Sequence, residues 1–197
     1  MEKTKKSLVE ARLPTKYGTF QIIAFPGDSK EKENMALVMG EIEGRILVRV
    51  HSECFTGDVL HSMRCDCGEQ LDLAMRRIAE EGKGIIIYLR QEGRGIGLVN
   101  KLKAYNLQDD GMDTVEANIA LGFNAELRGY QSAVDILKNL GAKKIKLMTN
   151  NPSKIEDLES AGFDVVTLGH SSVPNEENRD YLKTKASKMN HKLDLVD

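Results

Sequence analysis

All three cysteines of this 197-residue chain, Cys54, Cys65 and Cys67, lie within one short stretch of sequence. Thiolates are soft ligands that bind zinc strongly. Three of them leave one tetrahedral position for water or substrate, whereas a structural zinc site is usually closed by a fourth Cys or His. The spacing therefore predicts one catalytic zinc per chain. The alternatives are that His51 or His61 closes a structural site, that the cysteines are simply buried, or that the C-x-C is a redox pair.

Charged residues accompany the cysteines. Asp66 stands between two of them, and we expect a solvated or supporting carboxylate there and not a fourth ligand. Glu53 adjoins Cys54 and could handle protons at a metal-activated water. Cationic side chains suited to phosphate oxygens stand at predicted loops and strand ends, namely Arg49, Arg64, Arg90, Arg94, Arg128 and Lys154. These residues predict metal-assisted hydrolysis of a small molecule that carries phosphate.

A competing pattern begins at His51, because His51, Ser52 and Glu53 form the H-x-E of zinc nucleobase deaminases. That pattern continues with P-C-x-x-C, whereas this chain has C-x-C and no proline. A deaminase proper is therefore disfavoured. A purine or pyrimidine substrate still fits, because attack of a zinc-activated water on a ring carbon is chemistry that both readings share.

Composition restricts the classes of protein that remain. The chain has 28 basic and 30 acidic residues, 5% aromatic residues and no tryptophan, which argues against a nucleic-acid binder. No apolar stretch approaches the roughly 20 residues needed to cross a bilayer, so we expect no membrane partner. An odd number of cysteines without a secretory leader predicts a cytoplasmic protein.

The first part of the chain is predicted to be rich in antiparallel strands. Residues 1–18 read as a polar lead-in, residues 19–25 as a strand, and residues 26–34 as a charged loop. Residues 35–42 and 45–51 are expected to form a hairpin that turns at Glu43 and Gly44. On the second of these strands, Arg49 and His51 share one face.

The stretch after the cysteines changes to β-α alternation. Leu71, Ala74, Met75 and Ile78 form one apolar stripe of a helix over residues 69–81. Residues 84–89 are continuously apolar, as in a strand that is covered on both faces. A glycine-rich loop follows, with Gly93, Gly95 and Gly97 beside Arg90 and Arg94. It could receive an anion on backbone amides, or it is merely a tight turn before a helix.

Later elements complete the prediction of an α/β fold. Helices are expected up to Leu107 and near residues 115–121, 132–140 and 175–188, with strands at 143–149 and 163–168. Pro152 opens one more helix, so Thr149 and Lys154 lie where open α/β sheets bind ligands. We predict a single domain over residues 1–197, with a mixed sheet covered by helices and with residues 175–197 as terminal helix and tail.

Several long motifs resemble one family. The run RVHSECFTGDVLHSMRCDCGEQ, residues 49–70, closely resembles the zinc segment of GTP cyclohydrolase II, the first enzyme of riboflavin biosynthesis. RQEGRGIGL, KAYNLQDDGMDTVEAN and LMTNNPSK match further motifs of that family in the same order, and YLKTKASKMNH is similar too. The resemblance covers nearly the whole chain.

The resemblance implies an activity and a set of site residues. The family opens the imidazole ring of GTP, releases C8 as formate, removes pyrophosphate and leaves 2,5-diamino-6-ribosylamino-4(3H)-pyrimidinone 5′-phosphate. It implies a homodimer, zinc on the three cysteines and Mg²⁺ at the triphosphate. The implied GTP contacts are Arg49, Val50, His51, Ser52, Glu53, Gln70, Glu92, Gly93, Arg94, Thr114, Thr149 and Lys154.

The resemblance also implies catalytic residues and shows one departure. Tyr105 matches a tyrosine near the zinc chemistry, and Arg128 matches an arginine at the α-phosphate, where we prefer electrostatic stabilisation to nucleophilic attack. Glu126 stands where the family usually has an aspartate that accepts a proton, and Leu127 and Gly129 replace acidic neighbours. The alternatives are a variant that stops at a formamide intermediate or keeps its phosphates, and a non-catalytic protein that binds GTP or zinc.

Overall fold

A computed structural model of the chain describes residues 6–27, 32–124, 128–189 and 191. The strands are β1 (Val9–Thr15), β2 (Gly18–Pro26), β3 (Glu33–Met39), β4 (Arg45–Ser52), β5 (Gly84–Leu89), β6 (Lys144–Met148) and β7 (Asp164–Leu168). The helices are α1 (Phe55–Asp58), α2 (Cys67–Glu81), the 3-10 turn η1 (Glu92–Gly95), α3 (Leu98–Asp109), α4 (Thr114–Ala120), α5 (Gln131–Asn139), α6 (Pro152–Ser160) and α7 (Arg179–Lys188).

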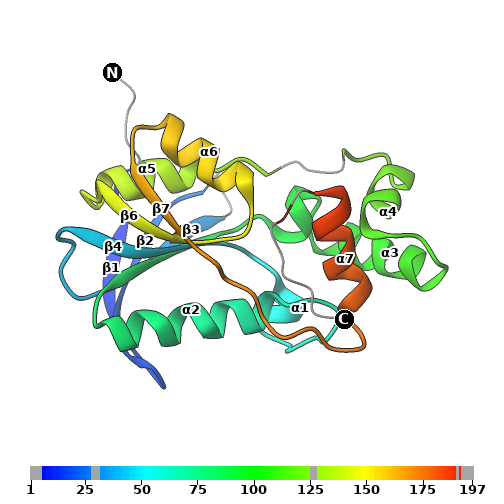
Figure 1. The fold of residues 1–197 in the computed structure, drawn as a ribbon, viewed down its shortest axis with the longest axis horizontal. Helices are drawn as coiled ribbons and strands as arrows, with labels where there is room; N and C mark the ends of the chain where they lie inside the picture. Colours follow the sequence, from blue (N-terminus) through cyan, green and yellow to red (C-terminus); the bar gives the residue numbers. More distant parts are fainter. Residues whose placement is uncertain (1–5, 28–31, 125–127, 190, 192–197) are drawn as a thin grey trace. The chain divides into compact units, whose positions relative to one another are not determined.

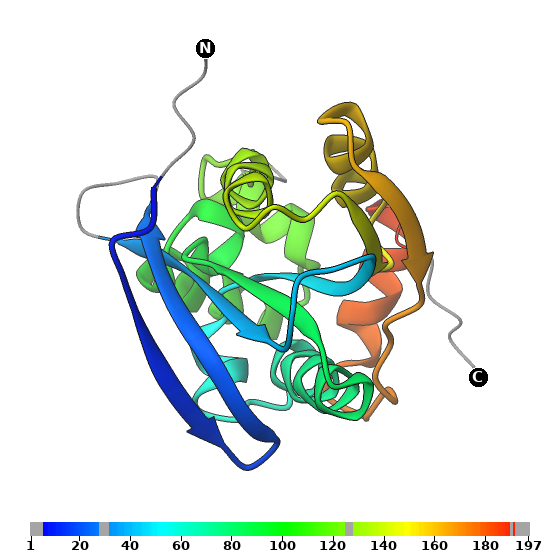
Figure 2. The ribbon, with the colours of Figure 1, turned by 90° about the vertical axis from the view of Figure 1, so that its left-hand side faces the viewer.

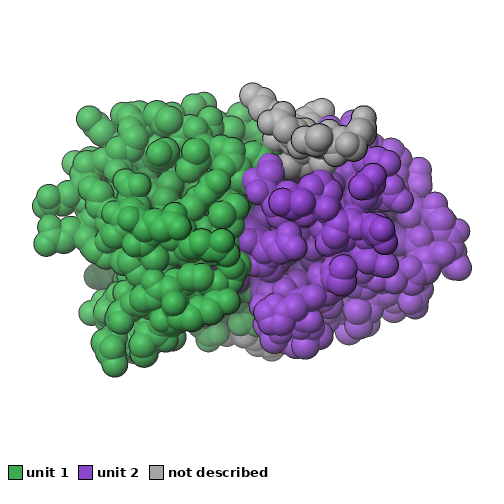
Figure 3. Space-filling model, turned by 60° about the horizontal axis from the view of Figure 1, so that its bottom comes forward, with its two compact units in different colours: residues 1–51, 72–90, 129–170 green, residues 52–71, 91–128, 171–197 purple. Residues whose placement is uncertain are grey.

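The chain divides into two compact units, each built from three separate stretches and coloured differently in Figure 3. Unit 1 contains Met1–His51, Asp72–Arg90 and Gly129–His170. Unit 2 contains Ser52–Leu71, Gln91–Arg128 and Ser171–Asp197. The single domain expected over residues 1–197 stays a prediction.

Unit 1 is built on a seven-stranded sheet with the order β1-β2-β3-β5-β4-β6-β7, to which unit 2 adds only Ser52 at the end of β4. The pairs β1/β2, β2/β3 and β3/β5 are antiparallel, whereas β4/β6 and β6/β7 are parallel. The prediction of an α/β fold with a mixed sheet and an antiparallel first part is therefore confirmed.

Helices cover both faces of this sheet. Within unit 1, α5 and α6 lie on one face, and the part of α2 from Asp72 onward lies on the other (Figures 1 and 2). The central strand β5 is accordingly apolar throughout, and Ile85, Ile86 and Ile87 are fully buried. Close packing of α2 requires Gly84, because a Cβ there would lie 2.7 Å from Cγ1 of Ile78.

The expected hairpin between residues 35–42 and 45–51 is wrong. Both strands form, but β5 lies between β3 and β4 in the sheet, and Met39 pairs with Gly84. At the end of β3, Gly40 has a φ of +66°, and a Cβ on it would lie 2.5 Å from the carbonyl oxygen of Gly82. The chain therefore approaches the start of β5 at Gly40 and does not turn back on itself.

The two ends of the chain also differ from expectation. Within the predicted lead-in of residues 1–18, β1 forms and pairs with β2, with Leu13 opposite Phe20. Its side chains are mostly exposed, as suits an edge strand, so its apolar alternation is weak. The terminal helix begins at Arg179, four residues later than predicted, after Asn175 and Asn178 have accepted each other's backbone amides.

The other predicted elements are confirmed within about two residues. Asp113 caps α4 in a capping box with Glu116, and Asn151 caps α6 with Pro152 at its start. Unit 2 contains α1, η1, α3, α4, α7 and the loop that carries the cysteines. None of the helices in the described part of the chain is both long enough and apolar enough to cross a membrane.

Candidate metal centre and its cavity

The three cysteines converge in unit 2. Their sulfur atoms all lie within 4.8 Å of one another, and the Cys54 and Cys65 sulfurs are 3.6 Å apart. Cys54 immediately precedes α1, Cys65 lies in the following loop, and Cys67 is the first residue of α2. The C-x10-C-x-C spacing thus places thiols from two helix starts and one loop around one point.

A glycine makes this convergence possible. A Cβ on Gly57 would lie 3.0 Å from the Cys65 sulfur and 3.2 Å from the Cys54 sulfur. It would therefore occupy the cradle between the thiols. Three soft donors around a cradle that any side chain would fill fit a zinc ion with one open position.

Hydrogen bonds concentrate negative charge on Cys54. Bonds from the Cys65 and Cys67 thiols, and then the charge of Lys101, lower the pKa of Cys54 well below its usual range despite burial. The same bonds to Cys54, together with burial, raise the pKa of Cys65 to about 11 and the pKa of Cys67 well above the ordinary value of a thiol. The lowered pKa favours the thiolate form of Cys54, which is the form that binds a metal.

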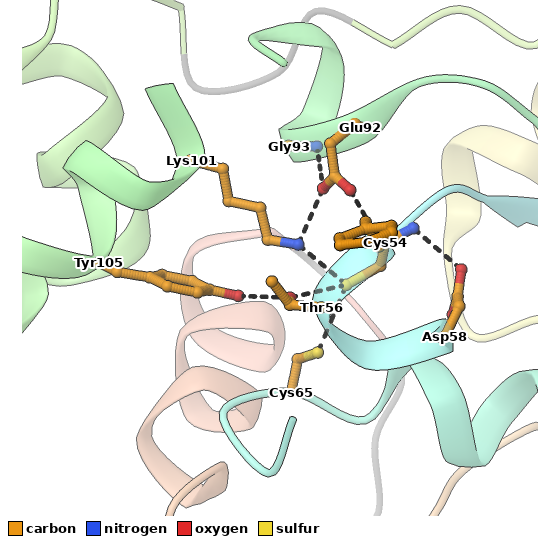
Figure 4. Close-up of polar contacts among 9 residues, drawn as sticks. Cys54, Thr56, Asp58, Cys65, Glu92, Gly93, Lys101 and Tyr105 are labelled. Atoms are coloured by element: carbon orange, nitrogen blue, oxygen red, sulfur yellow. Dashed lines mark hydrogen bonds and ion pairs between the residues drawn. The ribbon is translucent and has the colours of Figure 1, made fainter. Parts of the chain in front are cut away.

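Lys101 connects this thiolate to the glycine-rich loop (Figure 4). Its ammonium lies 3.1 Å from the Cys54 sulfur and 2.8 Å from Oε1 of Glu92. Burial alone would lower the pKa of Lys101, but the Cys54 charge and the Glu92 hydrogen bond raise it above its usual value. Glu92 also accepts the backbone amides of Phe55 and Gly93, so its carboxylate is engaged within the chain.

Tyr105 lies on the same face of α3 as Lys101, one turn later. Its hydroxyl is 3.1 Å from the hydroxyl of Thr56, which in turn lies 3.7 Å from the Cys54 sulfur. The cationic groups of Arg64 and Lys101 lie 5.0 Å and 5.7 Å from the centre of its ring. Burial raises the pKa of Tyr105, so the hydroxyl keeps its proton at neutral pH.

Arg94 is held in an unusual backbone conformation, with φ at +60° and ψ at 31° inside η1. A non-glycine residue adopts this left-handed region only at a cost, and such positions are common at ligand sites. Both terminal nitrogens of its guanidinium are buried and have no hydrogen-bond partner among the described residues. A buried cation without a partner is what an anionic ligand would satisfy.

These groups surround a cavity that opens to solvent. All of its lining residues belong to unit 2. The predicted site residues among them are Ser52, Glu53, Cys54, Cys65, Cys67, Glu92, Gly93, Arg94, Tyr105, Thr114 and Arg128.

Gln70 and Glu126 are the two other predicted residues of unit 2. Gln70 lies in α2 and donates its side-chain amide to Asp66 at 2.6 Å, and it is not among the described residues that line the cavity. Glu126 lies outside the described residues. The expectation of a solvated Asp66 is wrong, since that residue is only 1% exposed, which leaves the supporting role.

The remaining predicted residues gather in unit 1, where the parallel strands β4 and β6 end. The Arg49 guanidinium donates to the carbonyl of Met148 at 2.9 Å, and the Lys154 ammonium to the carbonyl of Val50 at 2.7 Å. The Thr149 hydroxyl accepts the Asn151 amide. The His51 ring stacks on Tyr88 with centroids 5.4 Å apart. Parallel strands of α/β sheets commonly present ligand-binding groups at this end.

Sequence reasoning missed Lys101, Thr56 and Tyr181, although all three belong to this part of unit 2. Lys101 stands four residues before Tyr105 on a helix, and that spacing is a signal that could have identified it. Tyr181 lines the cavity from α7, more than a hundred residues from the cysteines. Local spacing carries no signal for such a contact.

Comparison with known proteins agrees with these motifs. A sequence profile of the family described as GTP cyclohydrolase II matches residues 5–168. "GTP cyclohydrolase-2" of Actinobacillus succinogenes is 54% identical over 187 residues, covering 93% of this chain and 86% of that protein. "GTP cyclohydrolase-2" of Haemophilus influenzae is 52% identical over 188 residues, covering 93% of this chain and 87% of that protein.

One solved structure, that of RibBX, a two-domain 3,4-dihydroxy-2-butanone 4-phosphate synthase from A. baumannii, matches with a TM-score of 0.47 at 22% identity. It matches over 87% of this chain, which spans only 41% of the RibBX chain. The family profile and the relatives above decide the assignment: this chain belongs to the GTP cyclohydrolase II family.

Proposed function

We propose that this chain is a GTP cyclohydrolase II, a hydrolase that catalyses the first step of riboflavin biosynthesis. It opens the imidazole ring of GTP and releases formate and pyrophosphate, leaving 2,5-diamino-6-ribosylamino-4(3H)-pyrimidinone 5′-phosphate. The observation that carries the proposal is the group of three cysteines around Gly57, on a cavity that Arg94 also lines; the two terminal nitrogens of its guanidinium have no hydrogen-bond partner among the described residues. Membership of the GTP cyclohydrolase II family supports the choice of this reaction.

The residues that would hold the cofactors follow from the site. One zinc ion per chain would be held by Cys54, Cys65 and Cys67, and when bound it would supply Lewis-acid activation of a water for hydrolysis. Mg²⁺ would accompany the triphosphate of the substrate. The hydrogen bond from the Lys101 ammonium to the Cys54 sulfur adds to those from the other two cysteines in favouring the thiolate that binds a metal.

Other residues of this chain would donate and accept protons and bind the substrate. The Tyr105 hydroxyl, protonated at neutral pH, is positioned by Thr56 to donate a hydrogen bond to the purine ring as it opens. Arg94 and Arg128 on the cavity stabilise phosphate charge, and Glu126 accepts a proton during pyrophosphate release. The other proposed GTP contacts are Arg49, Val50, His51, Ser52, Glu53, Gln70, Glu92, Gly93, Thr114, Thr149 and Lys154.

Mass spectrometry of the product tests this assignment. With GTP, zinc and magnesium, we expect the mass of the diaminopyrimidinone monophosphate, and no consumption of GTP by a folded Cys54→Ser variant. Unchanged GTP with the parent protein, or full turnover by Cys54→Ser, would contradict the proposal. Cys54→Ser should keep the fold because the hydrophobic cluster of unit 1 contains none of the cysteines.

The second candidate is a variant enzyme with an altered product, and Glu126 favours it. A glutamate carries its carboxylate one methylene farther from the backbone than the aspartate usual in the family, and catalysis tolerates such displacement poorly. The product would then be a formamide intermediate or a species that keeps its phosphates. Glu126→Asp should restore pyrophosphate release if this candidate is correct. It should leave pyrophosphate release unchanged if Glu126 already acts as the proton acceptor.

Assembly and location complete the proposal. We expect a homodimer, on the strength of the family, and light scattering at micromolar concentration tests it. We expect the cytoplasm as the location, because Cys54, Cys65 and Cys67 are all free thiols and a reducing compartment keeps them so. Fractionation of cells that express a tagged chain tests that expectation.

A further inference from the structure

The terminal helix α7 has an interior face that its polar sequence does not predict. Most of its residues are charged or polar, yet Leu182, Thr184 and Lys185 are buried. Lys185 is 8% exposed, an uncommon degree of burial for a lysine. A buried ammonium requires a partner, and the identity of that partner connects α7 to the metal centre.

The partner of Lys185 is Asp66, the residue between Cys65 and Cys67. The ammonium lies 2.7 Å from Oδ1 of Asp66, whose side chain is 1% exposed. Its other oxygen, Oδ2, accepts the Gln70 amide at 2.6 Å. The carboxylate is therefore held from both sides, by α2 and by α7, so that the loop between the two thiols has little freedom to rotate.

Stability alone does not account for this pair. A buried ion pair contributes little net stability, because the cost of removing both charges from water offsets their attraction, and apolar residues of similar volume often serve as well. In some proteins, buried polar or charged groups instead fix one arrangement among several. Here the ion pair stands at Asp66, so the arrangement that it would fix is that of Cys65 and Cys67 on either side.

The same helix reaches two other parts of unit 2. Tyr181 stands one turn before Lys185, which lies 4.8 Å above its ring, and it lines the cavity. Lys188 bonds to Asp113 and to Glu116 at the start of α4, beside Thr114. One helix therefore contacts the cysteine loop, the cavity and the first turn of α4.

We propose that Lys185 is a positioning residue. Through Asp66 it holds Cys65 and Cys67 in the geometry that binds the metal, so α7 contributes to the metal site. The inference rests on the proposed function for the identity of the metal and the reaction. It assigns a role to the C-terminal helix that neither the cysteines nor the cavity explains by itself.

The test compares Lys185→Met with Lys183→Met, a matched change at an exposed position of the same helix. Zinc affinity is measured by competition with a chromophoric chelator, and kcat and KM are measured with GTP. We expect Lys185→Met to weaken zinc affinity by about tenfold or more, the scale seen for residues that support metal ligands. Lys183→Met should stay within about twofold, and Lys185→Arg should recover much of the loss because it restores the cation.

Lys185→Met leaves a buried carboxylate without its cation, so it could simply unfold. The double variant Asp66→Asn with Lys185→Met removes both charges and keeps an amide acceptor for Gln70. A folded double variant with zinc affinity and kcat like those of the parent would overturn the proposal. Weakened zinc affinity in a folded double variant supports it.

The outcomes also separate this inference from the proposed function. If the parent releases no formate from GTP, the proposed function fails, but the difference in zinc affinity between Lys185→Met and Lys183→Met still decides the role of Lys185. If the parent is fully active and the two lysine variants bind zinc equally well, the positioning role alone is wrong.

Discussion

Arg94 combines two features that are unfavourable in a folded protein. Its backbone is left-handed, with φ at +60°, and the terminal nitrogens of its guanidinium are buried without a hydrogen-bond partner among the described residues. Each feature carries a cost in free energy. A phosphate of the proposed substrate would offset the second cost, and that contact would explain why an arginine occupies a position that suits glycine.

Substitutions of Arg94 should therefore affect the free energy of unfolding and the KM for GTP in different ways. Arg94→Ala and Arg94→Gly should both raise KM for GTP by about tenfold or more, because a charge-assisted hydrogen bond is lost. Arg94→Gly should be more stable than Arg94→Ala by about 1 kcal/mol, because only glycine adopts this backbone without strain. Urea unfolding and steady-state kinetics measure the two effects. An unchanged KM in both variants would exclude Arg94 from substrate binding.

Gly57 provides a second prediction at the scale of one residue. Gly57→Ala should weaken zinc affinity by about tenfold, since its Cβ would press on the sulfurs of Cys54 and Cys65. Gly129→Ala is the matched control, because a Cβ there meets no atom within 4 Å. Chelator competition compares the two proteins. Equal affinities would show that the cradle between the thiols accommodates a methyl group.

Sequence spacing was sufficient to predict the cysteine group and to single out Arg94, because thiols and glycine-rich loops are local signals. It was not sufficient for Lys101, whose role depends on a hydrogen bond to a residue 47 positions away, nor for Lys185, whose partner is 119 positions away. Such contacts depend on tertiary packing, for which a single sequence has no periodic signature.

At the scale of elements, the start of α4 is held by charges from two helices. Asp113 caps the helix and bonds to Lys188 of α7, and Glu116 bonds both to the Asp113 amide and to Lys188. Partial burial would raise the pKa of Asp113, but hydrogen bonds from Lys188 and from the amides of Glu116 and Val115 hold it below 3.8.

This lowered pKa predicts how stability depends on pH. A depressed carboxyl pKa contributes stability that is fully present above the unfolded value, near 3.8, and is lost as the pH falls through the folded value. Lys188→Met should therefore lower the urea midpoint by a constant amount between pH 7 and pH 5, and the difference should shrink below pH 4. A difference that is unchanged at pH 3 would contradict this account, and Lys183→Met serves as the control.

Strands and helices were mostly predictable, but their pairing was not. The apolar stripe of α2 and the continuous apolar run of β5 identify those elements. Burial on one face of a helix gives a repeating apolar pattern, and burial on both faces of a strand gives an unbroken apolar run. The hairpin between β3 and β4 was a plausible local solution that β5 displaces by pairing with Val38 and Leu37 of β3. That pairing joins residues almost fifty positions apart, and only the complete sheet decides it.

At the scale of the whole molecule, the apolar core and the cysteine group belong to different units. The main buried cluster, which includes Phe25, Val48, Ile87, Ile136 and Leu147, comes entirely from unit 1. The cysteine group and the cavity belong to unit 2. The stability of the sheet should thus be largely independent of the metal, whereas the segments that carry the ligands should not be.

Hydrogen exchange with and without a chelator tests this division. Removal of zinc should speed amide exchange by about tenfold or more in peptides covering residues 52–71 and 91–109, because metal binding stabilises the local fold. Peptides from β5 and β6 should exchange at unchanged rates. Equal acceleration in both groups of peptides would mean that the metal stabilises the molecule as one cooperative unit.

A catalytic zinc on the three cysteines is tested most directly by a zinc titration of metal-stripped protein with GTP and magnesium present, in which formate and pyrophosphate are measured separately. We expect no formate without zinc, formate release that saturates at one zinc per chain, and pyrophosphate in equal amount. Formate release by fully stripped protein, or no recovery at one equivalent of zinc, would contradict a catalytic centre on Cys54, Cys65 and Cys67. Formate without pyrophosphate would instead point to the phosphate half of the reaction, where Glu126 replaces the usual aspartate.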